Sequence, residues 1–170
     1  MKRFLSSIDR MNEWMGNWVR VLVYAFTGLV CFEVLLRYGF NKPTIQLPVI
    51  VTMTAAAMYA LSLGNIARQD GHVRVDVFTR LLSKRGKAVL EVICGVLFFF
   101  PVIGALTASA LGWTWYAWSI DERDTQTFWY ARIGPIRTVV LIGLILFLLQ
   151  GVAIFVRNLE ILFGREKPHD

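Results

Sequence analysis

Residues 138–156 read TVVLIGLILFLLQGVAIFV and contain no charged side chain. A helix rises about 1.5 Å per residue, so roughly 20 residues cross a bilayer core about 30 Å thick. This stretch is therefore long enough to cross a membrane once. Three other apolar stretches precede it, and the sequence predicts four spans in all, at about residues 19–37, 47–66, 88–112 and 136–157.

The four spans are expected to be helices. Lipid offers the backbone no hydrogen-bond partner, which leaves helices and closed barrels as spanning structures. The apolar runs lack the period-two alternation of barrel strands. With 56% hydrophobic and 18% charged residues, the chain has too little polar surface for a soluble domain. We therefore predict an all-α integral membrane protein in which residues 1–170 form one domain with four transmembrane helices.

The distribution of basic residues predicts the orientation of the spans. Most of the 18 Lys and Arg residues lie in the N-terminal segment, in the connection between the second and third spans, and in the C-terminal tail. Cationic segments next to spans stay cytoplasmic, so both termini are predicted to lie inside the cell. The net charge of +6 then reflects topology and attraction to lipid headgroups. We predict membrane lipids as partners, and no nucleic acid.

Two segments have the apolar spacing of amphipathic helices that lie on the membrane surface. In each, apolar side chains recur every three or four residues beside basic residues. They are Phe4, Ile8, Met11, Met15 and Trp18 at the N-terminus and Val75, Phe78 and Leu82 in the middle connection. The alternative for each segment is a short solvated loop, and the regular spacing favours the interfacial helix.

Polar residues within the spans are few, and two of them are candidates for a role. Glu33 lies near the outer end of the first span and four residues before Arg37, the favourable order for an ion pair on a helix. Glu33 is either a proton or ion site or the partner of Arg37 at a helix end or subunit contact. Its position favours the pair, because a transport site is expected deeper. Gln150 is costly to expose to lipid and is predicted to hydrogen-bond to a neighbouring helix.

Small residues repeat at four-residue spacing on two spans. Such ridges let helix backbones approach closely, and in lipid this packing is a principal source of helix association. The sequence therefore predicts two packing faces, used either within the chain or by a partner. They consist of Ala56, Ala60 and Gly64 in the second span and of Gly104, Ala108 and Gly112 in the third.

Several classes of protein are disfavoured. The chain has no Gly-rich phosphate loop, and its two histidines, His72 and His169, lie outside the spans, so a haem would lack ligands. No Cys, His and carboxylate cluster has metal-ligand spacing. The acidic residues at 121–124 are better explained as a solvated turn than as a hydrolytic pair. We predict that the protein is not an enzyme and uses no cofactor.

Two short motifs resemble a known family. The run Gly71-His72-Val73-Arg74-Val75-Asp76-Val77-Phe78 follows the second span, and Arg37-Tyr38-Gly39-Phe40-Asn41 ends the first. Both resemble the small membrane subunit, DctQ-like, of tripartite ATP-independent periplasmic (TRAP) transporters, as do the four spans and the chain length.

The resemblance implies a non-catalytic subunit in a bacterial inner membrane. Its implied partners are a large multi-span permease subunit and a periplasmic substrate-binding protein, which together take up an organic anion on a sodium gradient. The small subunit would scaffold and anchor the large one. Within the motif, Gly71 would permit a tight turn, and His72 could titrate near neutral pH. Arg74 and Asp76 would either contact the spans or the large subunit, or cap and orient a surface helix.

The residues themselves are also compatible with a second function. A self-sufficient, proton-coupled exporter could assemble as a homodimer and use Glu33 as its proton carrier. The place of Glu33 beside the outer boundary, the basic middle connection and the two amphipathic segments argue against this alternative. A membrane anchor for an electron-transfer enzyme is a third possibility, disfavoured by the missing haem ligands.

Overall fold

The computed structural model describes residues 2–69, 84–125 and 127–163, and these are mainly helical. The first helix, α1, spans Lys2–Val34 and continues as a π-helical segment, η1, over Leu35–Gly39. The remaining helices are α2 (Gln46–Arg68), α4 (Lys84–Cys94), the π-helical segment η2 (Gly95–Phe99), α5 (Phe100–Ser119) and α6 (Gly134–Leu162).

Within the described residues, four helices are long and apolar enough to cross a membrane. They cover Leu5–Gly39, Gln46–Arg68, Arg85–Ser119 and Gly134–Leu162. The all-helical fold and the four candidate spans predicted from the sequence are thus confirmed.

The N-terminal amphipathic segment and the first span form one continuous helix, α1. No proline interrupts residues 2–34, so nothing in the sequence forces the helix to end between the two parts. Ile8 is buried, whereas Met11 and Trp18 are exposed. The placement of this segment at a membrane surface stays a prediction. The second amphipathic segment, with Val75, Phe78 and Leu82, lies outside the described residues.

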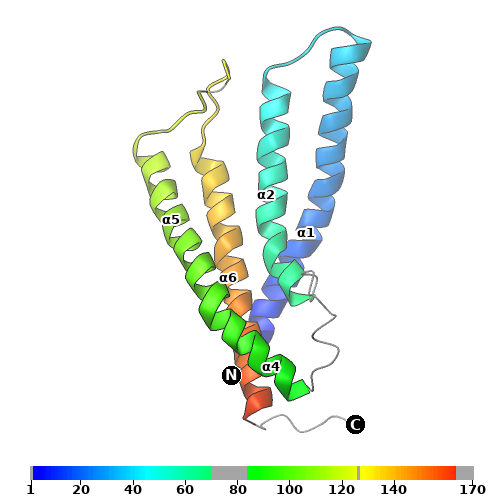
Figure 1. Ribbon diagram of the computed structural model, residues 1–170. Coiled ribbons are helices and arrows are strands. Elements are labelled where there is room, and N and C mark those ends of the chain that lie inside the picture. Colours follow the sequence, from blue (N-terminus) through cyan, green and yellow to red (C-terminus); the bar gives the residue numbers. More distant parts are fainter. Residues whose placement is uncertain (1, 70–83, 126, 164–170) are drawn as a thin grey trace.

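The helices are arranged as two hairpins that meet at one end (Figure 1). The α1–α2 hairpin and the α5–α6 hairpin converge where α1 begins and α6 ends, and they diverge toward the connections at 40–45 and 120–133 (Figure 1). Helix α6 packs against α1, α2, α4 and α5. It is therefore the element that joins the two hairpins.

The third long helix passes through Pro101 without ending. A proline lacks the N–H that would bond to the carbonyl four residues earlier, and its ring crowds that carbonyl. The chain is π-helical just before this point, and the N–H of Phe100 bonds to the carbonyl of Gly95. The wider turn accommodates the proline. The helix then continues to Ser119 as one candidate span.

Candidate functional site

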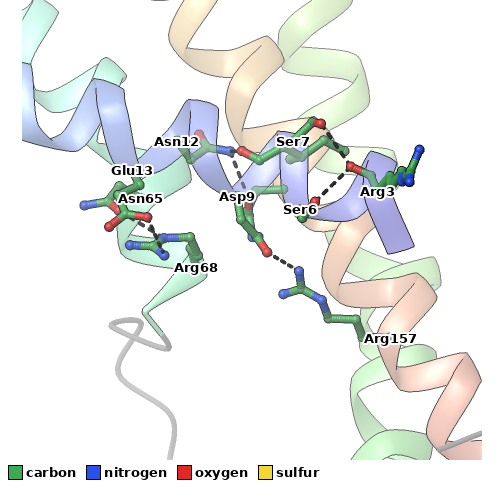
Figure 2. Close-up of polar contacts among 11 residues, drawn as sticks. Arg3, Ser6, Ser7, Asp9, Asn12, Glu13, Asn65, Arg68 and Arg157 are labelled. Atoms are coloured by element: carbon green, nitrogen blue, oxygen red, sulfur yellow. Dashed lines mark hydrogen bonds and ion pairs between the residues drawn. The ribbon is translucent and has the colours of Figure 1, made fainter. Parts of the chain in front are cut away.

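A partly buried cluster of polar side chains lies where the hairpins converge, and we call it the polar clasp. Its members are Asp9 and Asn12 of α1 and Gln150 and Arg157 of α6. Gln150 and Asn12 are fully buried. The Nδ2 of Asn12 donates to Oε1 of Gln150 at 2.8 Å, and Nε2 of Gln150 donates to Oδ1 of Asp9 at 3.1 Å. Arg157 forms an ion pair with the other oxygen of Asp9 (Figure 2).

The polar clasp attaches the first turns of α1 to the middle and end of α6. Leu5 and Ile8 are buried beside Ala153 of α6, with Leu149 and Val156 packed against them. The buried positions in the first half of α1 are Leu5, Ile8, Asn12 and Gly16; they repeat every three or four residues and form one helix face. The predicted contact of Gln150 with a neighbouring helix is present. Asp9 and Asn12 were not singled out in the sequence, although they lie on this face.

The same end of α1 also contacts α2. The carboxylate of Glu13 lies 3.4 Å from the guanidinium of Arg68 (Figure 2). A Cβ added to Gly64 would collide with Oδ1 of Asn12, and one added to Gly16 would collide with the side chain of Asn65. The two glycines therefore leave room for the amide side chains that fill the α1–α2 contact.

The small-residue ridge of α2 is used in part by this packing. Ala60 and Gly64 are buried, whereas Ala56 is exposed. A Cβ added to Gly143 of α6 would lie 2.5 Å from the carbonyl oxygen of Ala60. The backbones of α2 and α6 thus approach closely at this point, as small residues allow.

The ridge of α5 faces away from the other described helices. A Cβ added to Gly104 or to Gly112 would meet no atom within 4 Å, and Ala108 is exposed. The most apolar part of the helix Arg85–Ser119 has none of its residues buried within the chain, whereas 28% of the corresponding part of α6 is buried. This ridge is open to lipid or to a partner.

Glu33 lies at the opposite end of the molecule from the polar clasp. It is 8% exposed. The guanidinium of Arg37 donates to its Oε1 at 2.8 Å, and the hydroxyl of Thr44 donates to its Oε2 at 2.7 Å. Both carboxylate oxygens are therefore engaged. The arrangement connects the end of α1 and η1 to the short connection before α2.

Arginine side chains stabilise the connection between α5 and α6 through contacts with acidic residues and with a backbone carbonyl. Arg137 contacts both carboxylate oxygens of Glu122, at 2.8 and 2.7 Å, and donates to the carbonyl of Trp113 at 3.1 Å. Arg123 and Arg132 lie 3.0 and 3.3 Å from the carboxylate of Asp121. The acidic turn predicted at 121–124 is thus paired with basic neighbours. Large aromatic side chains are exposed around it, among them Trp113, Trp115 and Phe128.

The remaining predicted residues, Gly71, His72, Arg74 and Asp76, lie outside the described residues. In the described part of the chain, no three or more His, Cys, Asp or Glu side chains gather closely enough to hold a metal ion.

One comparison with known proteins identifies a family. The model of the family described as "Tripartite ATP-independent periplasmic transporters, DctQ component" matches residues 26–160, which is more than half of the chain. No curated protein and no solved structure matches the chain.

Proposed function

Because this chain belongs to the DctQ component family of tripartite ATP-independent periplasmic transporters, we propose that it scaffolds and anchors the large membrane subunit of such a transporter. In this proposal the protein is non-catalytic and forms one membrane domain over residues 1–170. Its partners are a large multi-span permease subunit and a periplasmic substrate-binding protein. The permease would carry an organic anion inward on a sodium gradient.

The observation that carries the proposal is that two buried polar side chains, Gln150 and Glu33, are engaged in contacts within the chain itself. Gln150 bonds across to α1, and Glu33 is held by Arg37 and Thr44. A transport site needs polar or ionisable groups that can exchange partners with a solute or proton. Polar side chains that are bound to partners within the chain instead make the helix bundle rigid. A scaffold for a moving permease requires this rigidity.

The outward ridge on α5 supports the same role. Gly104, Ala108 and Gly112 offer a small-residue face that no described helix of the chain covers. Helices in lipid associate through such faces. We propose that this ridge is where a helix of the permease subunit packs.

The proposed orientation places both termini in the cytoplasm of a bacterium, with the protein in the inner membrane. Four crossings bring the start of α1 and the end of α6 to one end of the molecule (Figure 1). Most of the basic residues lie in the N-terminal segment, in the connection that follows α2 and in the tail that follows α6. Their charge supports a cytoplasmic location.

The proposal is tested by affinity capture of the tagged full chain from native membranes in mild detergent, followed by mass spectrometry. A stoichiometric membrane protein with many spans is expected to co-purify. In cells that lack the small subunit but retain the inserted permease, uptake of the permease's solute is expected to be lost. Recovery of the chain alone, or unchanged uptake after its deletion, would contradict the proposal.

The substitution Glu33→Gln separates the scaffold from the proton-coupled exporter. Gln can still accept the hydrogen bond from Thr44 but cannot carry a proton. If the chain is an exporter, purified Glu33→Gln protein in liposomes loses proton-coupled transport that the unaltered protein performs. For the scaffold, the unaltered protein alone shows no such transport, and the variant differs at most in assembly with the permease.

A further inference from the structure

An apolar groove lies between the third long helix and α6, and Ala67 of α2 also contributes to its lining. Its cavity volume is about 570 Å³. One wall consists of residues from α4, η2 and α5, including Cys94, Phe98 and Val102, and the other consists of α6 residues that include Gly151, Ile154 and Phe155. The groove lies within the candidate spans Arg85–Ser119 and Gly134–Leu162. Whatever occupies it must therefore be apolar over most of its length.

The groove follows one face of the helix toward the basic end of α4. Its wall residues Glu91, Cys94, Phe98 and Val102 are three or four positions apart and form a stripe. One turn before Glu91, the same stripe reaches Lys87, which is exposed. Arg85, two positions before Lys87, is exposed on another face of the helix. The helical spacing thus places one basic side chain a turn beyond Glu91, and from Glu91 the groove runs into the apolar part of the span.

The charged residue inside the groove already has a partner. The Nδ2 of Asn158 donates to Oε2 of Glu91 at 2.5 Å, and Asn158 is buried. This carboxylate does not require a cation from the occupant. Apart from this pair, the residues that line the groove are apolar, and the exposed Lys87 lies one helical turn beyond its end.

We propose that the groove binds one anionic phospholipid, with an acyl chain between Phe98 and Phe155 and the phosphate beside Lys87. Basic pockets between spans attract anionic headgroups. The volume falls within the roughly 300–1,000 Å³ of small-ligand sites, whereas a helix with its side chains is about 10–12 Å wide and needs a broader surface. The proposal requires only that these helices span a membrane, and it does not rest on the scaffold function.

Native mass spectrometry of the purified full chain tests the proposal. Delipidated protein is titrated with phosphatidylglycerol or with phosphatidylcholine that has the same acyl chains. One phosphatidylglycerol is expected to stay bound under conditions that remove phosphatidylcholine. Lys87→Gln is expected to weaken phosphatidylglycerol binding about fivefold, the change that one basic side chain makes at an anionic surface. Lys42→Gln, at the opposite end of the molecule, is the matched control and should have no effect.

A second pair of variants tests the groove itself. In Gly95→Leu, a side chain starts at a point 3.6 Å from the ring of Phe155 and extends into the groove. In Gly104→Leu, the new side chain points to open space. The first variant is expected to lower lipid retention roughly tenfold or more, and the second to leave it unchanged. Equal retention of the two lipids by the unaltered protein, or equal effects of the paired variants, would overturn the proposal.

Cross-linking in native membranes distinguishes a lipid from a partner helix. Cys94 lines the groove, and Cys31 is the other cysteine of the chain. In a Cys31→Ala background, a short photoreactive maleimide on Cys94 is expected to form adducts with phospholipid. Adducts with another protein alone would mean that a helix fills the groove, and the lipid proposal would be wrong.

Discussion

Gln150 lies fully buried between α6 and the first turns of α1, where its amide uses both the oxygen and the nitrogen. A hydrogen bond between transmembrane helices contributes about 0.6 kcal/mol on average, but a buried polar group left without its partner costs about 1–3 kcal/mol. The main cost of losing the contacts of Gln150 with Asn12 and Asp9 would therefore be that polar groups of these two residues are left without this partner.

Gln150→Leu is expected to reduce the free energy of unfolding by about 1–2 kcal/mol, because Asn12 and Asp9 lose a buried partner. Detergent-denaturant titration followed by circular dichroism measures this change. Asn12→Leu and the double variant complete a cycle. If the two side chains interact, the double variant is destabilised by less than the sum of the single ones. Strict additivity would show that the bond between them contributes nothing.

Asn12 also explains why Gly64 is needed. Its Oδ1 has no hydrogen-bond partner among the described residues and lies against Gly64. A Cα–H group can act as a weak donor to such an oxygen, and the absence of a Cβ makes the approach possible. The four-residue spacing in α2 indicated a packing ridge, but the identity of the group packed on Gly64 depends on a residue far away in the chain.

At the scale of elements, α2 and α5 carry similar ridges with different surroundings. Ala60 and Gly64 of α2 meet α6 and α1, whereas Gly104, Ala108 and Gly112 of α5 face outward. The difference arises from the rotation of each helix about its own axis within the bundle. A four-residue repeat specifies a face of a helix but does not specify what the face meets.

The close α2–α6 contact predicts different effects for two glycines. Gly143→Ala is expected to reduce stability by about 1–3 kcal/mol, because its Cβ would lie 2.5 Å from the carbonyl oxygen of Ala60 and the helices must separate. Gly28→Ala, in α1 with no atom within 4 Å, is expected to be neutral or slightly stabilising. Thermal unfolding in detergent compares them, and equal melting temperatures would contradict the contact.

Filling the outward ridge of α5 is expected to reduce assembly with the permease subunit while the chain still folds. Ala108→Leu fills the ridge, and we expect it to lower recovery of the permease subunit about tenfold in affinity capture, for a loss of about 1.4 kcal/mol of packing. Ala25→Leu, also exposed but on α1, is the matched control and should leave recovery unchanged. Normal recovery with Ala108→Leu would place the permease contact elsewhere.

At the scale of the whole molecule, the two ends of the bundle are held by different chemistry. The polar clasp and a small apolar core join α1 to α6 at one end. At the other end, Glu33 makes contacts within the α1–α2 hairpin and Arg137 makes contacts within the α5–α6 hairpin. The two hairpins diverge there (Figure 1). The two hairpins thus pack together at the end predicted to face the cytoplasm and are separate at the other end.

The predicted orientation is tested with single cysteines in a background lacking Cys31 and Cys94. Ser6 and Ser119 are both exposed and lie near opposite ends of the long helices. With an impermeant thiol reagent added outside intact spheroplasts, Ser119→Cys is expected to react and Ser6→Cys to react only after permeabilisation. The reverse pattern would invert the topology.

The sequence alone determined the four spans and the Glu33–Arg37 pair. The length of an apolar stretch, and the neighbourhood of residues four apart on one helix, depend only on that helix and its solvent. The apolar stripe of the first segment was more ambiguous, because Ile8 packs in the core while Met11 and Trp18 are exposed.

Only the tertiary structure decided which of these helix faces meet one another. Asn12 and Gln150 are separated by 138 positions, and the ridges of α2 and α5 look alike in the sequence yet face opposite environments. The physical reason is that helix–helix contact in lipid depends on how two surfaces fit together. Such a fit is a property of pairs of helices, and the pattern along either one does not contain it.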